Sequence, residues 1–140
     1  MAKRIIPAKT ECLDEVLAFV EEQLEAYKCP MKIRIQIAVA VEEIFVNIAH
    51  YAYEKGEGDA AIQVEAAGKP VQVAITFSDG GIPYNPLSRA EPDITLSAEE
   101  RGIGGLGIYL VKKSMDDVDY EYRDGKNILT IKKILEMSEK

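Results

Sequence analysis

Apolar residues recur at helical spacing in the first third of the chain. We interpret Thr10 as the N-cap of a first helix, with acidic residues in the first turn, where the helix dipole favours them. The inward face of this helix repeats at i, i+3, i+4, i+7 and i+11, through Leu13, Val16, Leu17, Val20 and Leu24. A second helix is predicted from after Pro30 to about Tyr53, with a core-facing stripe formed by Ile37, Val41, Ile44, Phe45, Ile48 and Ala52.

Alternation of apolar and polar residues predicts strands elsewhere, beginning with a short one at residues 4–6. The stretches AIQVEA (61–66) and VQVAITF (71–77) flank turn residues 68–70, and VDYEYRD and NILTIKK flank a turn near Asp124 and Gly125, so each pair predicts a hairpin. A third helix is expected to end at about Met115. The order β-α-α-β-β-loop-α-β-β predicts an α+β two-layer sandwich, with helices on one face of a mixed, mainly antiparallel sheet.

Composition narrows the class of protein. With 140 residues, 47% of them hydrophobic, we expect one domain over residues 1–140. The formal charge of −7 and the lack of Lys/Arg-rich runs argue against nucleic acid as a partner. No apolar run is long enough for a membrane span and the start has no signal-peptide core, so we expect a cytoplasmic protein. Cys12 and Cys29 form no CxxC motif and are expected to be reduced and structural.

The second helix carries polar residues on a face separate from its apolar stripe. Glu43, Asn47, His50 and Glu54 recur at i, i+4, i+7 and i+11. Such a carboxylate could polarise a hydroxyl or a water while the amide oxygen helps to hold a hard cation such as Mg²⁺. The same spacing also fits a solvated helix edge, and a lone histidine is usually structural, so His50 is given no catalytic role.

The motif SDGGIPYNP, residues 78–86, directly follows an apolar strand. There Asp79 could accept a hydrogen bond from an amino group such as that of adenine, while the bare backbone of Gly80 and Gly81 approaches a flat ring. The alternative is an ordinary turn, since these residues are common in turns. The segment 84–101 is rich in proline and charge, which is typical of a lid over a site or of a disordered segment.

Residues 101–107, RGIGGLG, precede the third predicted helix. Backbone N–H groups and the positive end of a helix dipole can hold an anion there, and glycines allow phosphates to come close. The stretch has no Walker lysine and does not match G-x-G-x-x-G within a βαβ unit.

Three motifs together resemble those of the GHKL ATPases, the Bergerat-fold group formed by gyrase, Hsp90, histidine kinases and MutL. They are E-x-x-x-N on a helix, D-G-G-x-P after a strand and G-x-G-G-x-G before a helix. The chain length and the stretch GGLGIYLVKKSMDDVDYEYRDGKNILTIKK are most similar to the small stand-alone anti-sigma-factor serine/threonine kinases. The resemblance covers nearly the whole chain, from the first helix to the last strand.

This resemblance implies ATP and Mg²⁺ as cofactors. It implies Glu43 as the general base, Asn47 as the Mg²⁺ ligand, and Asp79 as the adenine reader with Gly81 beside it. Thr130 is implied to support the adenine-binding aspartate. Under a lid of residues 84–101, the phosphate cradle is implied to consist of Gly102, Gly104, Gly105, Leu106 and Gly107.

The same resemblance implies a STAS-domain anti-sigma-factor antagonist as the phosphorylated partner, with a sigma factor as a second client. The oligomeric state stays open, with a homodimer as one alternative. A different hypothesis also stays open, in which the chain is a nucleotide-controlled binding module that grips a partner and transfers nothing. Both hypotheses require Asn47, Asp79 and the glycines. The kinase hypothesis alone requires Glu43 as a base.

Overall fold

The computed structural model describes residues 2–53, 56–86 and 105–135. The chain begins with strand β1 (Ala2–Pro7), a 3₁₀ turn (Thr10–Cys12) and helices α1 (Leu13–Glu25) and α2 (Met31–Tyr51). Strands β2 (Asp59–Ala67) and β3 (Gln72–Asp79) form the first predicted hairpin. After helix α4 (Gly105–Ser114), strands β4 (Asp117–Arg123) and β5 (Lys126–Ile134) form the second hairpin.

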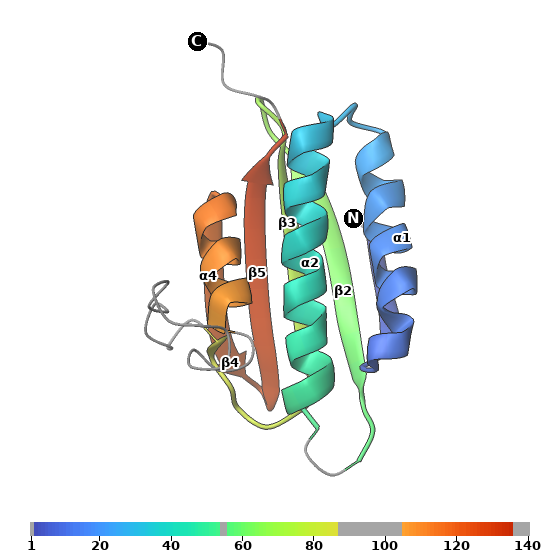
Figure 1. Cartoon of the computed structure of the whole chain (residues 1–140), viewed down its shortest axis with the longest axis vertical. Coiled ribbons are helices and arrows are strands. Elements are labelled where there is room, and N and C mark those ends of the chain that lie inside the picture. The colour runs from blue at the N-terminus through green and yellow to red at the C-terminus, as the bar shows by residue number, and fades with distance from the viewer. Residues whose placement is uncertain (1, 54–55, 87–104, 136–140) are drawn as a thin grey trace.

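The five described strands form one sheet in the order β1-β2-β3-β5-β4. All four neighbouring pairs are antiparallel, so within the described strands the sheet is not mixed as predicted. Helices α1, α2 and α4 lie on the same face of the sheet, which confirms the predicted two-layer α+β sandwich (Figure 1). Each strand therefore has one face toward the helices and one face away from them.

The core fills the space between the two layers. Strand residues that point toward the helices are buried, including Ile62 in β2, Phe77 in β3 and Ile131 in β5, whereas their neighbours in sequence are more exposed. On the helix side, Phe45 and Val41 of α2 are completely buried. Every second strand residue and one face of the helix are thus buried, as the apolar pattern predicts.

Local geometry explains one tight turn and corrects one expectation. In the β4–β5 turn, Asp124 and Gly125 have φ of 54° and 77°, the left-handed values that a tight two-residue hairpin requires. Thr10 is not the N-cap of α1, because it lies in the 3₁₀ turn, and Cys12 precedes α1 without a side-chain cap. None of the helices within the described ranges is long and apolar enough to cross a membrane.

Candidate functional site

A cavity opens where the C-terminal half of α2 faces the ends of β3, β5 and β4. The end of β3, the C-terminal end of α2 and the N-terminal end of α4 all lie at this end of the molecule (Figure 1). The walls are mostly apolar, with a few polar groups among them. They are formed by Ile44, Asn47, Ile48, Ala52, Phe77, Asp79, Tyr84, Pro86, Ile108, Tyr120, Asn127 and Leu129.

Asp79, the last residue of β3, carries the buried carboxylate of this cavity, with 6% of its surface exposed. Its Oδ1 accepts hydrogen bonds from the backbone N–H of Gly81 at 2.9 Å and from Nδ2 of Asn127 at 3.0 Å. Because both of these bonds go to Oδ1, Oδ2 is the oxygen that can accept a hydrogen bond from a ligand. The geometry suits recognition of an amino group.

Asn127 is a site residue that the sequence reasoning missed. It faces Asp79 directly in the β3–β5 register and is equally buried. Its Nδ2 also donates to the carbonyl of Ile82 at 2.7 Å, and its Oδ1 accepts the N–H of Tyr84 at 3.1 Å and the hydroxyl of Tyr120. The signal was available, because counting back by twos from Ile131 and Leu129 places residue 127 on the inward face.

Thr130 does not reach the cavity. It is the Cα partner of Thr76, and the two hydroxyl oxygens are 3.2 Å apart. Residue 130 is one step out of phase with Leu129 and Ile131, so it lies on the sheet face turned away from the helices. The expected support of Asp79 by Thr130 does not fit this geometry, and Asn127 makes that contact instead.

Asn47 and Glu43 lie one turn apart on α2. Asn47 is buried, lines the cavity and donates from Nδ2 to the backbone carbonyl of Glu43 at 2.9 Å. That bond fixes the orientation of the amide and leaves Oδ1 as the atom for a cation. Glu43 is half-buried and is not among the cavity residues. Burial of its carboxyl, with a smaller contribution from the charge of Glu42, raises the pKa of Glu43.

Gly81 is required by packing against the protein itself. A Cβ at this position would lie 2.1 Å from the carbonyl oxygen of Ala52, at the end of α2. The next residue, Ile82, donates its N–H to the same oxygen at 2.9 Å. The proposed approach of Gly81 to a flat ring is therefore not needed to explain the glycine.

The glycine-rich stretch is described only in part. Gly105, Leu106 and Gly107 form the first turn of α4, where unpaired N–H groups and the helix dipole favour an anion. Ile108, which follows them, lines the cavity, so this helix start lies close to it. Gly102, Gly104 and the part of the expected lid beyond Pro86 lie outside the described residues.

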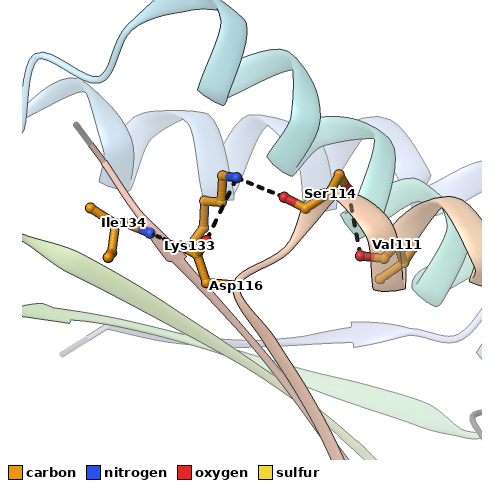
Figure 2. A network of polar contacts seen from close by, with 5 residues as sticks. All are labelled: Val111, Ser114, Asp116, Lys133 and Ile134. Atoms are coloured by element: carbon orange, nitrogen blue, oxygen red, sulfur yellow. Dashed lines mark hydrogen bonds and ion pairs between the residues drawn. The ribbon is translucent and has the colours of Figure 1, made fainter. Parts of the chain in front are cut away.

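The opposite end of α4 is fastened to the sheet. Nζ of Lys133 in β5 donates to the carbonyl of Ser114, the last residue of α4, at 2.7 Å. Asp116 accepts the backbone N–H of Ile134 at 2.6 Å and lies 4.0 Å from the Lys133 ammonium (Figure 2). A positive charge at a helix C-terminus is favourable, so this contact helps to fix the direction of α4.

The residues present fit an adenine nucleotide in chemistry, because an amino-group acceptor lies among apolar walls within reach of a helix N-terminus. The cavity volume is about 40 Å³, far below the roughly 150 Å³ of a protein cavity that holds one benzene ring. The base of a nucleotide is larger, so binding requires the walls to separate. Tyr84 and Pro86 are the wall residues that lie in the segment after β3, and we expect them to shift first.

Comparisons with known proteins find relatives of this chain. The family model described as a histidine kinase-like ATPase domain matches residues 6–133. The chain is 33% identical over 104 residues to a serine-protein kinase RsbW of Listeria monocytogenes, covering 71% of this chain and 66% of the relative. It is 28% identical over 100 residues to the serine/threonine-protein kinase BtrW of Bordetella bronchiseptica, covering 71% of this chain and 70% of that protein.

Among solved structures, a protein of Mycobacterium tuberculosis with RsbU and RsbW domains matches with a TM-score of 0.63 at 15% identity, over 96% of this chain and 33% of that one. That likeness concerns the fold. In the sequence comparison, the stretch that matches the Listeria kinase spans slightly less than two thirds of that relative's length. Because the family model matches almost the whole chain, the protein belongs to the family of histidine kinase-like ATPase domains.

Proposed function

We propose that this protein is an ATP-dependent serine/threonine protein kinase of the anti-sigma-factor type. The observation that carries the proposal is the buried Asp79, whose Oδ1 is held by Gly81 and Asn127 while its Oδ2 stays available in an apolar cavity beside α4. The 6-amino group of adenine would donate to Oδ2, and the phosphates would extend toward the first turn of α4.

The transferred group is the γ-phosphoryl group of ATP. In the reaction, a serine or threonine oxygen of the partner forms a bond to the γ-phosphorus, and the bond from that phosphorus to the β–γ bridging oxygen breaks, releasing ADP. Glu43 takes the hydroxyl proton onto its carboxylate, and its raised pKa makes it a stronger base. Oδ1 of Asn47 would help to hold Mg²⁺, which when bound neutralises charge on the phosphates.

The relatives named serine-protein kinases support a protein hydroxyl as the acceptor. The proposed partner is a STAS-domain antagonist of an anti-sigma factor, with a sigma factor as a second client. The test uses radiolabelled ATP and Mg²⁺ with the protein that co-purifies from the native cells.

The kinase hypothesis expects label on a serine or threonine of the partner. Glu43→Gln should reduce transfer by roughly 10²–10⁴-fold while nucleotide affinity survives. The control is Asn47→Ala, which should weaken Mg²⁺-ATP binding itself. If the wild type labels nothing but holds its partner differently with ATP and ADP, the chain is a nucleotide-controlled binding module and not a kinase.

A further inference from the structure

One phenol oxygen joins three segments beside the turn that follows Asp79. Tyr53 lies two residues beyond the end of α2. Its hydroxyl accepts a hydrogen bond from the backbone N–H of Gly80 at 2.9 Å and donates to the carbonyl of Asp59, at the start of β2, at 2.7 Å. Tyr53 therefore connects the end of α2 both to the sheet and to the turn that follows Asp79.

The chain makes room for this arrangement with two glycines. A Cβ at Gly58 would lie 2.2 Å from the ring of Tyr53, so the ring occupies the space that a side chain would need. On the other side, Gly81 packs against the Ala52 carbonyl, and Ile82 is hydrogen-bonded to the same oxygen. The turn after β3 is thus fastened to the end of α2 at two successive points, Gly80 through Tyr53 and Ile82 through Ala52.

This fastening acts on the group that would read the base. The N–H of Gly81 can reach Oδ1 of Asp79 only while the turn keeps its present shape, and the Gly80 bond to Tyr53 holds the peptide between them. Tyr53 does not line the cavity that holds Asp79, and its hydrogen bond to Gly80 connects it to the turn that positions this carboxylate. Burial, the largest cause, raises the pKa of Tyr53, so the hydroxyl keeps the proton that it donates to Asp59.

We propose that Tyr53 is a positioning residue for adenine recognition, which holds the turn after Asp79 so that Oδ2 faces the 6-amino group. The inference rests on nucleotide binding within the proposed function and adds to it the device that selects the base. Asp79 determines what is recognised, and Tyr53 determines where the acceptor lies relative to Asn47 on α2.

The test compares two nucleotides that differ in a single group. ATP carries the 6-amino group, and purine riboside triphosphate lacks it. Tyr53→Phe removes the hydroxyl and keeps the ring that fills the space beside Gly58. The matched control is Tyr27→Phe, since Tyr27 is 43% exposed and follows α1, outside the residues that line the cavity. Dissociation constants for both nucleotides are measured by calorimetry or by competition, and apo melting temperatures are recorded in parallel.

We expect Tyr53→Phe to weaken the binding of ATP by about 3- to 10-fold, which is the usual effect of losing one net hydrogen bond. The affinity for purine riboside triphosphate should stay unchanged, as should both affinities of Tyr27→Phe. In an Asp79→Asn background, Tyr53→Phe should weaken the binding of ATP no further, because the two residues act through one contact.

Equal losses for the two nucleotides would overturn the inference, because they would indicate general loosening of the fold. Additive losses with Asp79→Asn would overturn it as well.

The kinase assay decides a separate question. A wild type that binds ATP with a preference over purine riboside triphosphate, but labels no partner, contradicts the proposed kinase and leaves the role of Tyr53 intact. A wild type without that preference overturns the role of Tyr53.

Discussion

Asn127 donates its amide hydrogen to Oδ1 of Asp79 across 3.0 Å, while its own Oδ1 accepts from Tyr84 and Tyr120. Asp79 is an acceptor, whereas Tyr84 and Tyr120 are donors, so the Asn127 amide has a single favourable orientation. If the amide were reversed, its oxygen would face the carboxylate oxygen of Asp79. The ends of β3 and β5, the segment after β3 and strand β4 therefore share one polar centre. A buried network of this kind is costly when any member is left without a partner.

The first prediction follows from this network. Asn127→Ala leaves the buried Asp79 with one donor fewer, so unfolding should become easier by about 1–3 kcal/mol. The dissociation constant of ATP should rise by about tenfold or more, because the carboxylate loses its orientation. Chemical denaturation and calorimetric titration measure the two effects.

Thr130→Val is the control for the Asn127 variant, because its hydroxyl lies on the other face of the sheet beside Thr76. It should leave ATP affinity unchanged. A loss as large as that of Asn127→Ala would restore Thr130 to the nucleotide site.

The second prediction concerns the choice of base. In Asp79→Asn, the carbonyl oxygen should take the place of Oδ1, because Gly81 and Asn127 both donate there. The amide NH₂ then replaces Oδ2 and meets the cavity as a donor. ATP affinity should fall by about tenfold or more, and inosine triphosphate, whose 6-oxygen is an acceptor, should bind relatively better. An unchanged ratio of the two affinities would contradict the assignment of Oδ2.

The sequence was sufficient to predict the order of the described elements and the two hairpins, because period-two and helical burial repeat over several residues. It also indicated Asp79 and Asn47, which occur in recognisable spacings and do line the cavity. It could not separate Thr130 from Asn127. Both are polar residues of one strand, and a shift of one residue moves a side chain to the other face.

Gly81 shows a second limit of sequence reasoning. The motif indicated that a small residue is needed but not what it must avoid. Its close neighbour is the carbonyl of Ala52, which is 29 positions earlier in the chain. Tyr53 was missed for the same reason, because its partners Asp59 and Gly80 come together only when the turn packs against α2.

The third prediction concerns the fastening of α4. Lys133→Met keeps much of the apolar stem but removes the ammonium that binds the Ser114 carbonyl. We expect the free energy of unfolding to fall by about 1–2 kcal/mol, from the lost hydrogen bond and the lost charge at the helix C-terminus. Lys132→Met is the control, because residue 132 lies on the opposite face of β5. Equal losses in the two variants, measured by urea denaturation, would contradict this role for Lys133.

The fourth prediction uses the raised pKa of Glu43. Because the folded state holds this proton more tightly than the unfolded state, stability contributed by the protonated carboxyl is lost as pH rises from the ordinary value of 4.5 through the raised one. Above that window the ionised carboxylate disfavours the folded state. Glu43→Gln should therefore melt at a higher temperature than the wild type at neutral pH, and this difference should shrink as the pH falls toward 4.5.

Glu42→Gln is the matched control for the Glu43 variant. Glu42 is exposed and contributes only the smaller cause of the raised pKa of Glu43, so the effect of its substitution on the melting temperature should be weaker. Thermal melts across pH measure both. A wild type more stable than Glu43→Gln at neutral pH would mean that the ionised carboxylate is favourably held in the folded protein, and would remove the physical basis for a strengthened base at this position.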